Sequence, residues 1–262
     1  MEEESLVIGG FMYIDTHCHL FKSDYEDVLG VIEENRKNGI GAIINCSCSL
    51  DSIDEALELS LKHEDIYLAI GYHPSEATLI SDDDIFLLEN IVLKNKKIVA
   101  IGEIGLDYHY GREDIVLQKK LFEKQLDLAE KFNLPVVIHT RDAIGDTIEI
   151  LKRHNNFGVI HCFNGSLEVA KIFIDLGYKL GIGGVVTFKN CNLSSVLKNL
   201  SLTDIVLETD SPYLTPEPFR GKVNSSKYIP VIASKVAKIF NKDIIEVQNV
   251  TTATASILFD LF

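Results

Sequence analysis

The chain has 262 residues, of which 46% are hydrophobic, and acidic residues outnumber basic ones 39 to 25, for a net charge of −14. This composition excludes general disorder and suits one mid-sized domain, since a single (β/α)₈ barrel takes roughly 250 residues. The acidic balance disfavours a protein that coats nucleic acid or an anionic membrane through bulk electrostatics.

The cysteine content predicts a reducing, cytoplasmic location. The count is odd and no CxxC pair occurs, which argues against a disulfide scaffold and against a four-cysteine zinc site. No apolar run approaches the ~20 residues of a membrane span, so we expect no membrane association. Residues 1–11 begin with an acidic head, opposite in charge to a secretory signal, and we interpret them as an extension or as preceding an alternative start at Met12. The five cysteines are Cys18, Cys46, Cys48, Cys162 and Cys191.

Short runs rich in β-branched residues alternate with longer amphipathic stretches from Met12 to the C-terminus. Residues 24–39, 52–63 and 115–132 carry apolar side chains at helical spacing. Eight strand–helix units in a chain of this length predict a single (β/α)₈ TIM barrel of the α/β class over residues 12–262. The eight candidate strands are residues 12–17, 41–47, 66–73, 98–105, 135–140, 157–163, 179–185 and 205–210.

An open, doubly wound sheet is the main alternative fold. Such a sheet usually has fewer strands and places a glycine-rich phosphate turn after the first one. Here the first candidate strand leads into Asp-Thr-His-Cys-His at residues 15–19. The sequence therefore favours the closed barrel.

Five of the eight histidines lie at or just beyond the end of a candidate strand. The carboxyl ends of the strands carry the active site in barrels of this class. A single histidine there is more often structural than functional, but five together favour a functional site. They are His17, His19, His73, His139 and His161.

The two histidines at the end of the first candidate strand form a His-x-His pair. Residues two apart on a strand point to the same face, so His17 and His19 both face the barrel mouth while Cys18 faces the helices. Their Cα atoms, roughly 7 Å apart, allow both rings to bind one cation. We expect Cys18 to be a small buried side chain without a catalytic role.

Two carboxylates complete a metal-binding pattern. Glu103 ends the apolar run IVAIGE, where an unpaired carboxylate is costly but one between two cations is stabilised. Asp210 ends IVLETD, and His139 and His161 end two intervening strands. This set suits a two-metal hydrolase with ions roughly 3.5–4 Å apart. Its mixed donors accept Mg²⁺, Mn²⁺ or Zn²⁺, and Glu208 is expected to hydrogen-bond a histidine ligand.

Further side chains in the predicted mouth loops are candidates for substrate contacts. His73 and Asp107 suit contact with a phosphate or orientation of a water molecule, with packing behind the site as the alternative. Aromatic side chains that could stack on a base, or simply pack, are Tyr72, Tyr108, Tyr110 and Phe188. Basic side chains placed to hold phosphates are Arg112, Arg141, Lys189, Arg220 and Lys222.

Seven ordered segments resemble the signatures of the TatD-related DNase family, whose members are metal-dependent hydrolases on an amidohydrolase-like barrel. They are DTHCHL, GYHP, GEIGLDY, HTRDA, HCFNGS, GVVTFKN and ETDSPYL. The resemblance implies that His17, His19 and Asp210 hold one ion, that His139 and His161 hold a second, and that Glu103 bridges them. One departure is that Ser225 and Ser226 replace an expected Glu-Pro, from which we expect a more flexible loop and an altered substrate preference.

The function expected from these observations is two-metal hydrolysis of DNA, as an exonuclease on single-stranded ends, with Glu103 and Asp210 as the catalytic carboxylates. The resemblance leans towards a 3′ end. A metal-dependent amide or ester hydrolase, such as an aminoacyl-tRNA deacylase, is the alternative that the same ligands permit. A non-catalytic binding protein with a relict site is a further alternative, which the complete ligand set disfavours.

Overall fold

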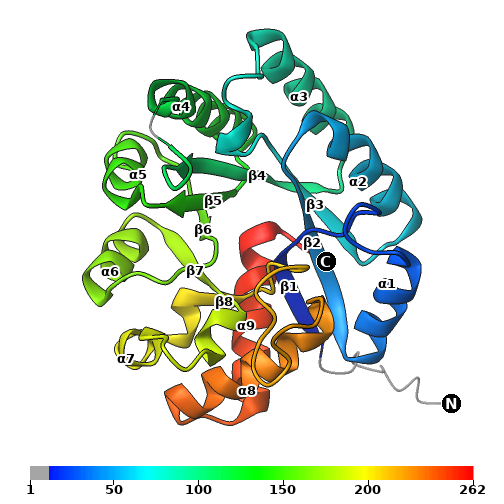
Figure 1. The fold of residues 1–262 in the computed structure, drawn as a ribbon, viewed down its shortest axis with the longest axis vertical. Coiled ribbons are helices and arrows are strands. Elements are labelled where there is room, and N and C mark those ends of the chain that lie inside the picture. The colour runs from blue at the N-terminus through cyan, green and yellow to red at the C-terminus, as the bar shows by residue number, and fades with distance from the viewer. Residues whose placement is uncertain (1–11, 112, 262) are drawn as a thin grey trace, which may run out of the picture.

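A computed structural model of the chain describes residues 12–111 and 113–261. The predicted extension and Arg112 lie outside these ranges. The eight described strands form one parallel sheet in sequence order, which confirms the predicted barrel (Figure 1). The strands are β1 Tyr13–Cys18, β2 Ile40–Ser47, β3 Ile66–Ile70, β4 Ile98–Asp107, β5 Val136–Arg141, β6 Gly158–Ile160, β7 Tyr178–Ile182 and β8 Ile205–Leu207.

The helices surround the strands, and the three expected from periodicity coincide with α1, α2 and α4 (Figure 1). No helix in the described ranges is long and apolar enough to cross a lipid bilayer. The helices are α1 Val28–Lys37, α2 Leu50–Lys62, α3 Asp82–Lys94, α4 Ile115–Phe132, α5 Ile144–Leu151, α6 Leu167–Asp175, α7 Leu193–Leu197, α8 Ile229–Phe240 and α9 Ile244–Phe259, with short 3₁₀ turns η1 Pro74–Glu76, η2 Gly184–Thr187, η3 Leu202–Asp204 and η4 Ser226–Tyr228.

Two hydrophobic clusters account for the layers of the fold. The larger lies between strands and helices, and the smaller combines side chains from the strands with Ala255 and Phe259 of α9. Small or β-branched residues such as Ala69 and Val137 supply the smaller cluster. These shapes fill the narrow interior of an eight-stranded barrel.

The barrel closes where β1 meets the segment after β8. Asp15, fully buried, accepts hydrogen bonds from the backbone N–H of Thr209 (3.0 Å) and from its hydroxyl (2.6 Å). The backbone N–H of Asp210 donates to the carbonyl of His17 at 2.9 Å. These contacts bring the ends of the first and last strands together.

The strand predicted over residues 98–105 continues to Asp107 as β4, and Glu103 lies within it. The pairing with β5 shifts between Ile101 and Ile104, where three steps on β4 match two on β5. Such bulges change the direction of a side chain. Gly105, with φ of 145°, makes this path possible, because a Cβ there would lie 1.9 Å from the carbonyl oxygen of His139.

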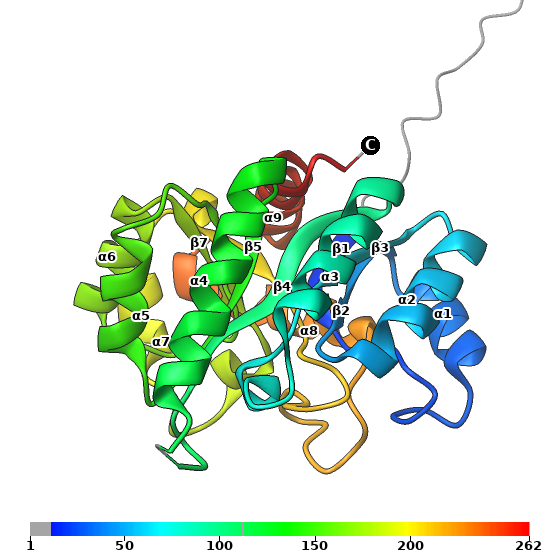
Figure 2. The same ribbon diagram turned by 90° about the horizontal axis from the view of Figure 1, so that it is seen from above.

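The segment after β8 also differs from the prediction. β8 ends at Leu207, so Glu208 to Asp210 lie beyond the strand. Ser225 and Ser226 are buried, and the side-chain amide of the buried Asn224 donates to the carbonyls of Thr209 (2.9 Å) and Tyr213 (2.5 Å). This segment is therefore anchored at its base. It projects from the end of the barrel opposite the chain's C-terminus (Figure 2, orange).

Candidate metal centre

His17 and His19 converge as the His-x-His pattern predicted, with their Nε2 atoms 3.2 Å apart. Cys46 of β2 supports both rings from behind. Its carbonyl oxygen lies 3.0 Å from Nδ1 of His19, and its Sγ lies 3.2 Å from Nδ1 of His17. When Nδ1 of His19 carries the proton, its N–H donates to the carbonyl oxygen of Cys46, and Nε2 is left free to bind a cation. Cys18, between the two histidines, is buried in the cluster between strands and helices, as alternation predicted.

Glu103 presents one carboxylate oxygen to each of two histidine pairs. Its Oε2 lies 3.5 Å from Nε2 of His17 and 3.8 Å from Nε2 of His19. Its Oε1 lies 2.7 Å from Nδ1 of His139 and 3.8 Å from Nε2 of His161. This carboxylate is buried, and its two oxygens face different imidazoles.

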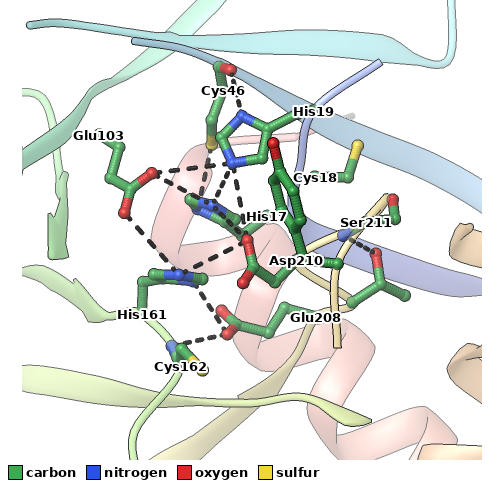
Figure 3. Close-up of polar contacts among 12 residues, drawn as sticks. His17, Cys18, His19, Cys46, Glu103, His161, Cys162, Glu208, Asp210 and Ser211 are labelled. Atoms are coloured by element: carbon green, nitrogen blue, oxygen red, sulfur yellow. Dashed lines mark hydrogen bonds and ion pairs between the residues drawn. The ribbon is translucent and has the colours of Figure 1, made fainter. Parts of the chain in front are cut away.

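Asp210 completes the group from the opposite side. Its Oδ1 lies 3.6 Å from Nε2 of both His17 and His19, and 3.8 Å from Nε2 of His161. Figure 3 shows these side chains, together with Glu103, pointing towards a common centre. The side chain of Asp210 is 15% exposed, against 5% for that of Glu103. Asp210 therefore lies at the solvent side of the cluster.

The spacing of these donor atoms fits a divalent cation. Bonds of about 2.0–2.2 Å in a tetrahedral arrangement separate neighbouring ligand atoms by about 3.3–3.6 Å. The separations among His17, His19, Glu103 and Asp210 run from 3.2 to 3.8 Å. The residues present therefore match the requirements of a metal centre at the carboxyl end of the barrel.

Glu208 holds His161, as the sequence suggested. Its Oε1 lies 3.0 Å from Nδ1 of His161 and accepts a hydrogen bond from the backbone N–H of Cys162 at 2.6 Å. Glu208 is fully buried. A carboxylate at Nδ1 directs Nε2 of the ring into the cluster and increases its basicity as a ligand.

The site's electrostatics favour a cation. Burial opposes protonation of His161, yet Glu208, Asp210 and Glu103 raise its pKa to about 10. Burial also opposes the charge on Glu103, but the surrounding histidines hold its pKa well below the usual range. Without a metal the carboxylates thus retain protons on nearby imidazoles, which an incoming metal ion must displace.

His73 and Asp107, predicted as substrate contacts, both lie against His139. Oδ2 of Asp107 is 3.1 Å from Nε2 of His139, and the ring of His73 meets that of His139 edge-on at 4.6 Å. The contacts with Asp107 and Glu103 raise the pKa of His139 to about 9 despite its burial. Burial lowers the pKa of His73 to about 4, so this ring is neutral at pH 7.

The predicted basic residues within the described ranges are exposed: Arg141 ends β5, and Lys189, Arg220 and Lys222 follow later strands. Arg141 lies over the ring of Tyr110 at 5.4 Å, and Arg220 lies over Phe188 at 4.3 Å. Lys189 and Lys222 are exposed. Within the described ranges, none of these four cations contacts the histidine and carboxylate cluster. Two candidate stacking residues, Tyr72 and Tyr108, are buried, which favours packing for them.

Three residues near the cluster were not singled out from the sequence. Cys46 and Cys48 lie at the end of β2, a strand whose sequence carries no histidine or acidic motif. Tyr213 is 58% exposed, with its ring 6.2 Å from that of His19. The position of Cys48 just after a strand was the one available signal, because strand ends form the mouth of a barrel.

The family model of the TatD-related DNases matches residues 14–260. The chain belongs to this family. The uncharacterised metal-dependent hydrolase YabD of Bacillus subtilis is 37% identical over 253 residues, covering 95% of this chain and 99% of YabD. YcfH of Escherichia coli, also an uncharacterised metal-dependent hydrolase, is 31% identical over 258 residues, covering 95% and 96%. As a TatD-family protein, this chain is a metal-dependent hydrolase.

A solved structure agrees in fold over almost the whole barrel. The crystal structure of YjjV, the TatD homologue from Escherichia coli K12, aligns with a TM-score of 0.87 at 30% identity, covering 95% of this chain and 98% of YjjV.

Proposed function

We propose that this TatD-family protein is a two-metal phosphodiesterase that hydrolyses DNA from single-stranded ends in the cytoplasm. The observation that carries the proposal is Glu103, whose two oxygens each face a different pair of imidazoles at 2.7–3.8 Å. A buried carboxylate arranged in this way suits two adjacent cations. Paired divalent cations lower the pKa of water and withdraw charge from a phosphate oxygen, which is the chemistry of phosphodiester hydrolysis.

The protein's own residues supply binding, orientation and a proton acceptor. We assign Asp210 as the acceptor for the proton of the attacking water, because it is the more exposed carboxylate of the cluster. Its Oδ1 faces the histidines, which leaves Oδ2 for the proton. His73, neutral at pH 7, can donate or accept a hydrogen bond with a phosphate beside His139.

Side chains at the mouth of the barrel are suited to binding a short nucleic-acid substrate. Arg141 and Arg220, each beside an aromatic ring, are suited to phosphate contacts, and we propose the same role for Lys189 and Lys222. The exposed rings of Tyr110 and Tyr213 offer faces on which an unpaired base can stack. The net charge of the chain is −14, so we expect it to bind DNA through a few local cations. Such binding suits an accessible strand end better than a long stretch of duplex.

The test uses the full-length protein, stripped with chelator and reloaded separately with Mg²⁺, Mn²⁺ or Zn²⁺. Single-stranded oligonucleotides labelled at the 3′ or the 5′ end report cleavage and its polarity. We expect stepwise shortening from one end, with loss of activity in chelator and slower action on blunt duplex. A generic ester and an aminoacyl-tRNA form the parallel arm. Metal-dependent turnover of these substrates without cleavage of DNA would overturn the proposal in favour of amide or ester hydrolysis.

A further inference from the structure

Cys48 lies one residue beyond the end of β2, in a row of chemically active side chains. β1 and the residue after it contribute His17 and His19, and β4, two strands beyond β2 in the sheet, contributes Glu103. In the ligand set implied by the family resemblance, the second strand contributes nothing. In this chain that place at the mouth of the barrel holds a half-buried thiol.

The thiol points at the oxygen of Glu103 that faces His17 and His19. Sγ of Cys48 lies 3.6 Å from Oε2 of Glu103. It also lies 3.8 Å from Nδ1 of His19, but that nitrogen is directed to the carbonyl of Cys46 at 3.0 Å. Glu103 is therefore the residue through which Cys48 joins the centre.

The separation of Sγ and Oε2 matches two ligands of one ion. With bonds of about 2.3 Å to sulfur and 2.0–2.2 Å to oxygen, two ligand atoms at an angle of about 110° are about 3.5–3.7 Å apart. His19, Cys48 and Glu103 together form a set of donor atoms within 4.8 Å of one another. A sulfur donor at this place changes which metal the site prefers, since soft thiolates select Zn²⁺ and disfavour Mg²⁺ and Mn²⁺.

We propose that Cys48 is an additional ligand of the ion held by His17, His19 and Asp210, and that it makes this centre selective for zinc. As the sulfur–metal bond forms, the thiol proton passes to solvent, so that charge and atoms balance. His17, His19, Asp210 and Glu103 supply four donors. The thiolate makes five ligands, a number that Zn²⁺ accepts. The inference concerns the metal alone and is independent of whether the substrate is DNA.

Cobalt substitution tests the proposal directly. Co²⁺ bound to a thiolate shows an intense near-ultraviolet charge-transfer absorption that imidazole and carboxylate ligands do not produce. We expect this band in the cobalt-loaded wild-type protein, its loss in Cys48→Ser, and its retention in Cys191→Ser, which removes another partly exposed thiol. In a competition between Zn²⁺ and Mg²⁺, Cys48→Ser should lower the preference for Zn²⁺ at least about tenfold.

A second measurement needs no variant and so does not depend on how a variant folds. Alkylation by iodoacetamide, read by peptide mass spectrometry, should be at least about tenfold slower at Cys48 when Zn²⁺ is bound, with Cys191 unaffected. A cobalt-loaded wild-type protein without the thiolate band would overturn the proposal. So would a band that survives in Cys48→Ser, or alkylation of Cys48 at equal rates with and without Zn²⁺.

Discussion

Oε1 of Glu208 lies 3.0 Å from Nδ1 of His161, and no part of Glu208 is exposed to solvent. The pair joins the segment after β8 to the residue after β6, so that one buried carboxylate fixes a ring whose other nitrogen faces Glu103 and Asp210. The orientation of His161 therefore depends on a residue that itself lies outside the proposed ligand set.

Replacement of this carboxylate tests the dependence. Glu208→Gln should weaken metal affinity or activity about 10- to 100-fold, because it removes the charge that holds His161 in its binding tautomer. Metal content and turnover, with circular dichroism as the measure of folding, give the result. The matched control is Glu168→Gln on the exposed surface of α6, which should change neither. Unchanged metal affinity in a folded Glu208→Gln protein would show that His161 needs no such support.

Replacement of Cys18, in contrast, should leave the metal centre intact. Cys18 lies between two proposed ligands in the sequence, but its side chain is buried on the other side of the strand. Cys18→Ala should keep full activity and metal content, and should lower the free energy of unfolding by about 1 kcal/mol. Urea denaturation and metal analysis measure both. Loss of bound metal with the fold intact would place Cys18 in the centre and contradict the orientation described above.

The dependence of DNA binding on salt distinguishes a local site from a basic track. Contact with about two to four phosphates of a single strand predicts a log–log slope of roughly −1.5 to −3. Fluorescence anisotropy of a short labelled oligonucleotide, with the Asp210→Asn variant at fixed metal concentration, measures the slope. Arg220→Ala or Lys222→Ala should each reduce it by at most about one contact. A slope steeper than about −5 would contradict binding at an end.

Away from the centre, Asp65 and Arg36 predict a pH-dependent contribution to stability. Arg36 donates to both oxygens of Asp65 at 2.6 Å, and although burial opposes the charge, this contact lowers the pKa of Asp65. A lowered pKa in the folded state means that the contribution is present above the ordinary value of about 3.9 and is lost as pH falls through the folded value.

The Asp65→Asn variant measures this contribution. Because the side chain of Arg36 is 41% exposed, we expect a destabilisation below about 1 kcal/mol at pH 7. Urea denaturation of wild type and variant should show the difference shrinking towards zero below about pH 4. A difference that grows on acidification would contradict the sign of the pKa shift.

The sequence was most informative where a residue's role depends on strand order and periodicity. The alternation at residues 13–19 was enough to place His17 and His19 together and Cys18 apart from them. The bulge that redirects Glu103 could not be predicted, because it arises from the pairing of β4 with β5. The contacts that Cys46 makes with His17 and His19 could not be predicted either, because they depend on how β1 and β2 pair and not on any motif.

The sharing of Glu103 between two ions is tested most directly by metal stoichiometry and turnover in Glu103→Ala. Elemental analysis of the reconstituted wild-type protein should give two ions per chain, and the variant should lose at least one of them. Hydrolysis of single-stranded DNA should fall at least about a hundredfold, with circular dichroism unchanged. A folded Glu103→Ala protein that keeps both ions and wild-type turnover would contradict the account.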